Sequence, residues 1–380
     1  MATILFLMRY SLDHPDNFTT KFNGQLAGMR ALGHTALCIG VRGGEMCLME
    51  GDQVTPLQKN RFSSLPGYRH TKLYWDLMSA ARRVIAARRV DAVYLRYKPL
   101  SPNVMGMAKL NRQKGGKLIV EIPTYPSQKE PDHRPLRRAL LALTERLLKR
   151  LSPLVDLFTL VGEHNKEGRL LGRPAINICN GVEPDLLPMR RVNTAPGEIH
   201  ALLLASVSRY QAYDRLLKGM AQDRAASENL FLHLVGGDVD GAVEQLKEQA
   251  ERERLHLEIH GPLYGGALSD LFDRCDVGVG TLGLYRKGID VCSVLKVREY
   301  MGRGLPFVYS GEDDMLSTPA DFMRRVSNDD APVPAAALTE LALSLKGQAD
   351  VPRRMRAYAK EHMSWQAVWK TVLEKVALDA

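Results

Sequence analysis

Lys296 and Glu299 are the residues whose chemistry and spacing are most informative. They lie three positions apart in a segment, from about Ser293 to Gly302, whose pattern predicts a helix, so both would lie on one helix face. Ser293 could cap the start of this helix. A helix N-terminus with a hydroxyl and a lysine beside it suits a phosphate, and a carboxylate one turn deeper suits ribose hydroxyls. The alternative, which spacing alone favours, is a common Lys–Glu pair on a solvated face.

The elements around this helix form a strand–loop–helix–strand unit from Asp276 to Ser310. A short apolar strand is predicted from Asp276 to Gly280, and a second buried strand from Pro306 to Ser310. The loop after the first strand is rich in glycine and basic residues and includes Arg286. Because ligands bind at the carboxyl ends of strands in open α/β sheets, we expect a ligand at this loop.

The same segment resembles a known motif. Residues 293–306 read S-x-L-K-x-x-E-Y-M-x-x-G-L-P, which resembles the donor-site motif of family 4 glycosyltransferases, in the branch that builds bacterial capsular and exopolysaccharides. In the wider family two glutamates flank seven residues here, and the second grips the ribose of a nucleotide sugar. Glu299 matches this second glutamate. Val291 stands where the first would fall, a departure that the S-x-L-K branch shares.

Other phrases carry this resemblance into the rest of the second half. The run S-R-Y-Q-A-Y-D-R-L at 208–216 resembles a loop in which related enzymes place an arginine or lysine on the donor pyrophosphate, and Arg209 is the candidate. A Gly-Gly turn after the strand at 231–235 would lie beside the nucleotide, and Gly-Pro-Leu at 261–263 resembles a turn near the base. The resemblance thus implies catalytic roles for Arg209 and Lys296, which with Arg286 would neutralise the leaving diphosphate. The implied donor-binding residues are Glu299, Ser293, Arg286, Gly236, Gly261 and Leu263.

Phrases in the first half imply an acceptor side. The runs D-A-V-Y-L-R-Y at 91–97 and E-I-P-T-Y-P at 121–126 resemble the same branch, and both end strands. They contribute Arg96, Glu121 and Tyr125. The loop after the first strand supplies Asn17 and Lys21, which could touch acceptor or donor phosphate. The alternatives are a helix cap at Asn17 with a solvated lysine, and a carboxylate at Glu121 paired with an arginine such as Arg96.

Length and pattern predict two domains. The chain has 380 residues, more than one ordinary domain, and alternates strand and helix signals. The resemblance implies an α/β fold of the GT-B type, with two facing Rossmann-like domains and a cleft between them. We expect an acceptor-side domain at 1–185, a linker at 186–197, a nucleotide-sugar domain at 198–350, and C-terminal helices at 351–380 that cross back to the first domain.

Charge and apolar patterning bear on partners and compartment. Lys and Arg exceed Asp and Glu by 52 − 43 = 9, which favours anionic partners. The five cysteines form no C-x-x-C pair, and no apolar run is long enough for a signal or a membrane span, so we expect a cytoplasmic protein. Residues 134–151 form a basic, leucine-striped helix that suits either an anionic membrane surface or a core-facing position.

Several function classes lack their motifs. The histidines are dispersed without HExxH, no P-loop or G-x-S-x-G occurs, and the basic segments lack interleaved aromatics. We therefore predict no metal, no cofactor and no nucleic acid. The resemblance implies a retaining, metal-independent glycosyltransferase that uses a nucleotide diphosphate sugar and a glycan or lipid-linked acceptor. A nucleotide-sugar epimerase on the same fold and a non-catalytic nucleotide-sugar-binding subunit remain as alternatives, the latter because of Val291.

Overall fold

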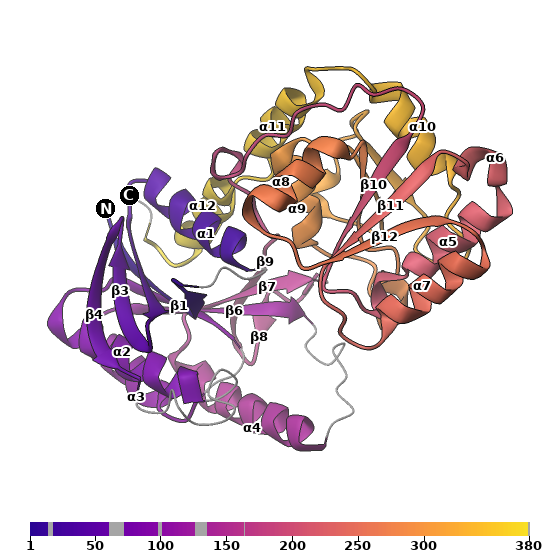
Figure 1. Ribbon diagram of the computed structural model, residues 1–380. Helices are drawn as coiled ribbons and strands as arrows, with labels where there is room; N and C mark the ends of the chain where they lie inside the picture. Colours follow the sequence, from indigo (N-terminus) through magenta and orange to yellow (C-terminus); the bar gives the residue numbers. More distant parts are fainter. Residues whose placement is uncertain (14–17, 61–71, 98–100, 126–134, 163, 379–380) are drawn as a thin grey trace. The chain divides into compact units, whose positions relative to one another are not determined.

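The computed structural model describes residues 1–13, 18–60, 72–97, 101–125, 135–162 and 164–378, with the backbone alone for 72, 135–138 and 140. The chain divides into two compact units, each with its own sheet and apolar core (Figure 1). Unit 1 consists of Met1–Ile178 together with Trp365–Ala380, and unit 2 of Cys179–Ser364.

Unit 1 is built on a nine-stranded sheet in the order β4-β3-β2-β1-β5-β6-β7-β9-β8. Its central six strands, from β2 to β9, run parallel, and antiparallel hairpin strands extend both edges. The strand order reverses between β1 and β5, which marks a switch point. The elements are β1 (Thr3–Ser11), α1 (Thr19–Ala31), β2 (Thr35–Arg42), β3 (Glu45–Glu50), β4 (Gln53–Lys59), α2 (Lys72–Ala87), β5 (Ala92–Arg96), α3 (Val104–Gln113), β6 (Lys117–Tyr125), α4 (Pro135–Leu151), β7 (Leu157–Gly162), β8 (Arg169–Leu170), β9 (Arg173–Asn177) and α12 (Trp365–Lys375).

The last helix, α12, completes unit 1. The indole N–H of Trp369 donates to the carbonyl of Gln25 on α1 at 2.8 Å, and the Trp369 ring packs edge-on against Phe6 and Tyr94. A Cβ added at Gly28 would lie 2.6 Å from that of Trp365, so the two helices approach at a distance that only glycine permits. Of the C-terminal helices predicted to cross back, α12 does so, while α11 (Val351–His362) belongs to unit 2.

Unit 2 is a six-stranded, wholly parallel sheet in the order β12-β11-β10-β13-β14-β15, with helices on both faces (Figure 1). This is the dinucleotide-fold order 3-2-1-4-5-6, with its switch point between β10 and β13. The elements are β10 (Ile199–Leu204), α5 (Tyr213–Gln222), α6 (Arg224–Ser227), β11 (Leu230–Val235), α7 (Ala242–Arg252), β12 (His256–Gly261), α8 (Gly265–Arg274), β13 (Val277–Val279), α9 (Leu295–Arg303), β14 (Phe307–Ser310), β15 (Met323–Val326), α10 (Ala336–Leu345) and α11.

Residues 186–197, predicted as a linker, belong to unit 2 instead. The buried guanidinium of Arg190 donates to the carbonyls of Gly304 and Cys275, and the backbone N–H of Arg190 donates to the carbonyl of Arg303. These bonds fix the segment against the end of α9. Its prolines therefore mark an extended segment that packs on unit 2.

Helix α4 has two different faces in its described half. Leu147 and Leu151 are buried in the core of unit 1, whereas Leu143 is 48% exposed. The core-facing interpretation therefore holds for the last two turns, while Lys149 and Arg150 point to solvent. The side chains of Leu136 and Leu140, which belong to the same predicted stripe, and those of Arg137 and Arg138 beside it lie outside the described residues. No helix in the described chain is long and apolar enough to cross a bilayer.

Candidate functional site

The switch point of unit 2 gathers polar side chains from three segments. The chain leaving β10 forms a short 3₁₀ turn, Arg209–Gln211, before α5, and the chain leaving β13 continues through Thr281. Lys296 lies in the first turn of α9. The loops that leave two diverging strands of an α/β sheet form the place where such folds bind ligands.

Lys296 is held by neutral groups. Its Nζ donates to Oε1 of Gln211 and to the hydroxyl of Tyr213, both at 2.7 Å, and lies 5.1 Å from the centre of the Tyr213 ring. The hydroxyl of Thr281 donates to the same Gln211 oxygen at 3.0 Å. The ammonium has three N–H donors, so one remains for another partner.

No carboxylate in the described chain pairs with Lys296. Burial lowers the pKa of this lysine to about 7 from its ordinary 10.5, because the charged form loses solvation and no anion restores it. The alternative of a Lys–Glu pair on a solvated face is therefore wrong. Lys296 is a positioned, partly buried lysine that has no anionic partner among the described residues.

Ser293 does not cap α9, which begins at Leu295 without a side-chain cap. Its hydroxyl instead accepts hydrogen bonds from the backbone N–H of Asn180 at 2.6 Å and from Arg298 at 2.7 Å. Arg298 also forms a buried bidentate pair with Asp313. Ser293 thus holds the backbone at Asn180 next to α9, which explains why the predicted cap is not formed.

Glu299 lies one turn after Lys296 and is partly buried. Its Oε1 accepts a hydrogen bond from Arg303 at 3.0 Å, an i,i+4 pair in which the glutamate side chain is 19% exposed. Among the described contacts its second oxygen, Oε2, accepts no hydrogen bond. The carboxylate therefore keeps acceptor capacity for a hydroxyl-bearing ligand while Arg303 fixes its orientation.

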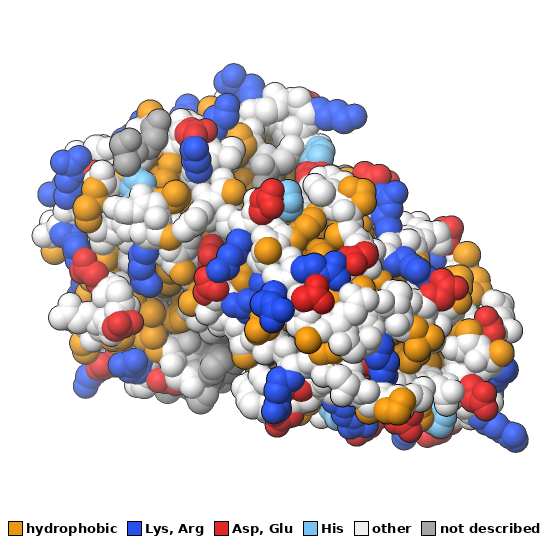
Figure 2. All heavy atoms as spheres, turned by 90° about the horizontal axis from the view of Figure 1, so that it is seen from above, with side chains coloured by type: hydrophobic (Ala, Val, Ile, Leu, Met, Phe, Trp, Pro, Cys, Tyr) orange, Lys and Arg blue, Asp and Glu red, His pale blue; other side chains and the backbone are white. Residues whose placement is uncertain are grey.

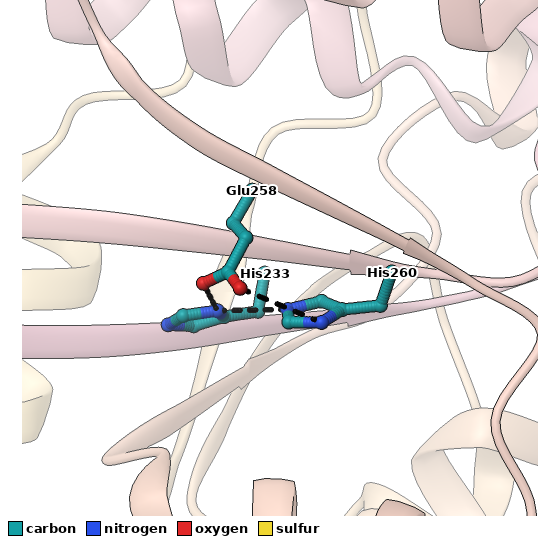
Figure 3. Close-up of side chains that lie close together, drawn as sticks. All are labelled: His233, Glu258 and His260. Atoms are coloured by element: carbon teal, nitrogen blue, oxygen red, sulfur yellow. Dashed lines mark hydrogen bonds and ion pairs between the residues drawn. The ribbon is translucent and has the colours of Figure 1, made fainter.

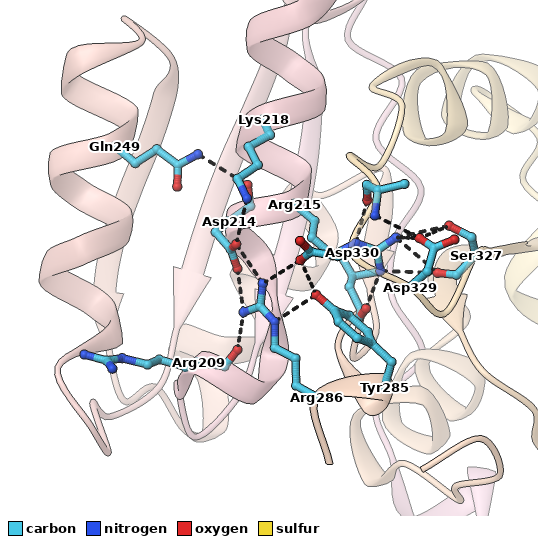
Figure 4. A network of polar contacts seen from close by, with 12 residues as sticks. Arg209, Asp214, Arg215, Lys218, Gln249, Tyr285, Arg286, Ser327, Asp329 and Asp330 are labelled. Carbon is cyan, nitrogen blue, oxygen red and sulfur yellow. Dashed lines mark hydrogen bonds and ion pairs between the residues drawn. The ribbon is translucent and has the colours of Figure 1, made fainter. Parts of the chain in front are cut away.

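Arg286 holds the 3₁₀ turn at 209–211 against the start of α5. It forms a bidentate pair with Asp214 at 2.9 and 2.8 Å and donates to the backbone carbonyl of Arg209 at 2.6 Å (Figure 4). These bonds raise the pKa of Arg286 above its ordinary value. The exposed side chain of Arg209 points away from this network in Figure 4. Arg286 thus positions the turn, and Arg209 is the cation left exposed.

The turn itself is tightly packed. Ala212, after the 3₁₀ turn, has φ +53, a left-handed conformation that favours glycine. At Gly236, which follows β11 with φ +135, an added Cβ would lie 1.5 Å from the carbonyl oxygen of Ala205. The N–H of Gly236 donates to the carbonyl of Gly261 at 2.9 Å, and Leu263 follows half-buried. The glycines predicted near the ligand thus join the ends of β11 and β12 to the loop after β10.

In unit 1 the structure brings together Lys21, Arg96 and Glu121. Glu121 is fully buried and pairs with Lys21 at 2.8 Å and with Arg96. It also accepts hydrogen bonds from Tyr94 at 2.7 Å and Gln25 at 3.2 Å. The two cations lower the pKa of Glu121 to about 2 against the opposing effect of burial. The predicted alternative of a carboxylate paired with Arg96 is confirmed.

The remaining acceptor-side candidates are less informative. The hydroxyl of Tyr125 accepts from the side-chain amide of Asn165 at 3.2 Å. Asn17 lies outside the described residues. The sequence did not single out Gln211, Tyr213 and Thr281, the residues that hold Lys296. The phrase at 208–216 drew attention to Arg209 alone, because nothing in a sequence shows which side chains meet across 85 positions.

Several solved structures resemble the whole chain. The catalytic domain of starch synthase IV from Arabidopsis thaliana, bound to ADP and acarbose, matches with a TM-score of 0.65 and 9% identity, over 100% of this chain and 99% of that one. AviGT4, a glycosyltransferase involved in avilamycin A biosynthesis, matches with a TM-score of 0.58 and 13% identity, over 99% and 97%. HepE from Anabaena, in complex with UDP and glucose, matches with a TM-score of 0.56 and 12% identity, over 99% and 100%.

These identities establish the fold alone. The chain has the GT-B fold, α/β with two parallel-sheet units, so the predicted fold class is confirmed. No family model and no curated protein sequence matches the chain.

Proposed function

We propose that this protein is a retaining glycosyltransferase that moves a sugar from a nucleotide diphosphate sugar to a glycan or lipid-linked glycan, in the building of a bacterial surface polysaccharide. The observation that carries the proposal is Lys296, a partly buried lysine at the switch point of unit 2 that has no anionic partner among the described residues. A donor diphosphate supplies the missing charge. The structural neighbours crystallised with UDP or ADP support this choice of ligand class.

The proposed chemistry begins with the diphosphate. Its oxygens accept from the third N–H of Lys296 and from the free backbone N–H groups that begin α9. As the bond to the sugar breaks, negative charge grows on the leaving diphosphate, and a positioned cation stabilises that charge more than it stabilises the bound donor. Arg209 supplies a second cation from the clamped turn. We name no protein nucleophile, since retention in this proposal proceeds on one face of the sugar.

The rest of the donor is assigned by position. Glu299, one turn after Lys296, binds ribose hydroxyls through its free carboxylate oxygen. The turns at Gly236, Gly261 and Leu263 lie at the carboxyl ends of β11 and β12, where they suit the nucleoside. In this proposal Lys296 and Arg209 neutralise the diphosphate without a metal ion.

The acceptor is assigned to unit 1. Because the ammonium of Lys21 already pairs with Glu121, this lysine supports the site from within, by holding α1 to β6. Arg96, whose side chain is 16% exposed, and the hydroxyl of Tyr125 remain the proposed acceptor contacts. Both lie at the carboxyl ends of parallel strands, beside one another in the sheet.

A ligand panel tests the proposal. UDP-, GDP-, dTDP- and ADP-sugars are added separately to the purified protein, and the unfolding temperature is measured. We expect one class to raise it, and the rise to be lost in Lys296→Ala. Radiolabelled donor is then incubated with and without glycan acceptors. Label in a glycan supports transfer, whereas an epimer formed without acceptor indicates an epimerase. Binding that never leads to turnover indicates a non-catalytic subunit.

An association with anionic membranes extends the proposal to lipid-linked acceptors. The exposed cations Arg146, Lys149 and Arg150 lie on α4 of unit 1. Each basic residue near an anionic bilayer contributes about 1 kcal/mol. On the face shown in Figure 2, Lys and Arg side chains alternate with Asp and Glu, so no continuous basic patch is visible there. The attraction would therefore depend on α4.

Vesicle binding tests this extension. Changing the three α4 cations to Gln should weaken binding to phosphatidylserine vesicles at low salt by about 3 kcal/mol, roughly a hundredfold. The matched control changes Lys247, Arg252 and Arg254, three exposed cations of unit 2, and should have little effect. Wild-type protein that ignores these vesicles contradicts membrane association and favours a soluble acceptor.

A further inference from the structure

A row of three histidines crosses three neighbouring strands of unit 2. Nδ1 of His200 on β10 lies 2.9 Å from Nε2 of His233 on β11, and Nδ1 of His233 lies 3.1 Å from Nε2 of His260 on β12. One carboxylate stands at the His200 end of the row, and another lies beside His233 and His260. Glu198 is 3.2 Å from Nε2 of His200, and Glu258 is 3.2 Å from Nδ1 of His233. None of these residues belongs to the site around Lys296.

When all three imidazoles are neutral, the row has fewer N–H donors than contacts that need one. Each neutral imidazole has one N–H, and a carboxylate can only accept. If His200 donates to Glu198, then His233 must donate its only proton to His200. Its Nδ1 then presents a lone pair toward both Glu258 and His260. Nδ1 of His260 is also 3.7 Å from Glu258, and an imidazole with one N–H can donate to His233 or to Glu258 but not to both.

As a result, at least one contact in the cluster brings two lone pairs together without a proton between them. One possible ligand atom from each of His233, Glu258 and His260 lies within 4.8 Å of the others (Figure 3). Ligands about 2.0–2.1 Å from a tetrahedral Zn²⁺ lie roughly 3.3 Å apart, and here Nδ1 of His233 lies 3.1 Å from Nε2 of His260 and 3.2 Å from Oε2 of Glu258. The cluster therefore has the spacing as well as the donor types of a metal site.

We propose that His233, Glu258 and one ring nitrogen of His260 bind a divalent transition-metal ion, with Zn²⁺ as the expected metal. Two imidazoles and one carboxylate are ligands that suit Zn²⁺ and leave a fourth position for water. His200 and Glu198 form the outer chain that fixes the tautomer of His233, as carboxylate–histidine pairs do behind metal ligands. The ion would tie the edge strand β12 to β11, just before the turn at Gly261.

Burial and access fit this role. His233 is 1% exposed, and its Nδ1 faces both Glu258 and His260. Glu258 is 54% exposed, which leaves a path from solvent. Arg274 lies 3.6 Å from Glu258 and is the cation that a bound metal would displace from this carboxylate.

Two of the three proposed ligands are spaced in the sequence as neighbours on one face of a strand, two residues apart. Residues 256–260 read H-L-E-I-H, and alternate residues of a strand share one face. On a helix Glu258 and His260 would not share a face. The absence of HExxH, a helical motif, therefore led to the prediction of no metal.

Metal titration tests the proposal. Protein freed of metal with EDTA is titrated with Zn²⁺ by calorimetry and with Co²⁺ by visible absorption, which reports tetrahedral coordination directly. We expect one ion per chain at micromolar or tighter affinity, weakened at least tenfold in His260→Ala and in Glu258→Gln. Both residues are partly exposed, and circular dichroism confirms that each variant is folded.

His256→Ala is the matched control, because His256 lies on the same strand, stacks on Phe231 and is exposed. It should leave the affinity unchanged. Wild-type protein that binds Zn²⁺ only at millimolar concentration, without a tetrahedral Co²⁺ spectrum, overturns the proposal. Equal weakening in His256→Ala and His260→Ala overturns it too, since the ion would then be held by surface histidines in general.

Discussion

Lys21 in unit 1 and Lys296 in unit 2 occupy comparable places, each on a helix near the carboxyl ends of parallel strands, but their surroundings differ. Lys21 has a buried carboxylate partner in Glu121, and its pKa falls only to about 8. Lys296 has an amide and a phenol, and its pKa falls to about 7. Burial acts on both lysines, and a counter-ion opposes it in one case alone.

The difference separates a structural cluster from a binding site. Both carboxylate oxygens of Glu121 are occupied: they accept from Lys21 and Gln25 on α1 and from Tyr94 and Arg96 on β5. We call this cluster closed, because no acceptor is left for a ligand. At Lys296 one N–H and the charge of the protonated form have no counter-ion among the described residues. A fold that keeps such a group must either bear its desolvation cost or bind an anion there. We therefore assign a structural role to Glu121 and Lys21 in the first cluster, and ligand binding to the second.

The largest effect should come from breaking the closed cluster. Glu121→Gln leaves Lys21 and Arg96 buried without their anion and should lower the free energy of unfolding by about 3–5 kcal/mol, measured by urea denaturation at pH 7. Glu50→Gln, which breaks the exposed pair with Arg88, is the control and should cost under about 1 kcal/mol. Equal losses in the two variants would contradict the buried cluster's structural role.

The same pair has a defined pH dependence. The folded-state pKa of Glu121 is depressed to about 2 from 4.5, so its contribution is complete above about pH 4.5 and is lost as the pH falls toward 2. Wild-type protein should therefore lose stability over this window more steeply than Glu121→Gln.

The second largest effect is expected at Lys296, whose surroundings leave one N–H for a ligand. Lys296→Ala should lower turnover at saturating donor about 10²–10³-fold, because charge on the departing diphosphate loses a preorganised cation. Lys247→Ala, an exposed lysine on α7, should leave turnover unchanged. The stability of Lys296→Ala should equal or exceed that of wild type, opposite in sign to the effect of Glu121→Gln. Turnover within twofold of wild type would remove Lys296 from the mechanism.

The smallest effect is expected at Glu299, and it tests whether the donor site around Lys296 extends to this residue. Glu299→Gln should weaken donor binding by about 1.5–3 kcal/mol, roughly ten- to a hundredfold, through loss of charge-assisted bonds to ribose. Wild type should discriminate against a 2′,3′-dideoxy nucleotide by a similar factor, and the variant should discriminate little. If the variant keeps the full discrimination, Glu299 serves only Arg303.

Local pattern predicted much of this molecule. The α/β order, the unit around Lys296 and the pairing of Glu121 follow from apolar periodicity and from residues at strand ends. Contacts between distant segments did not follow, such as Lys21 with Glu121 across 100 positions. The cap predicted at Ser293 failed because Asn180 and Arg298 compete for its hydroxyl. The histidine row depends on strand neighbours that no single segment reveals.

Proton uptake on donor binding tests the central claim most directly. At pH 8 an apo Lys296 with a pKa of about 7 is mostly neutral, and a bound diphosphate would raise that pKa. Calorimetry in two buffers of different ionisation enthalpy, with the nucleotide sugar that stabilises the protein best, should show uptake of roughly 0.9 proton per donor bound. A nucleotide sugar has no phosphate proton of its own near this pH. Lys296→Arg, always charged, should show none. Uptake near zero in wild type, or equal uptake in both proteins, would contradict the account.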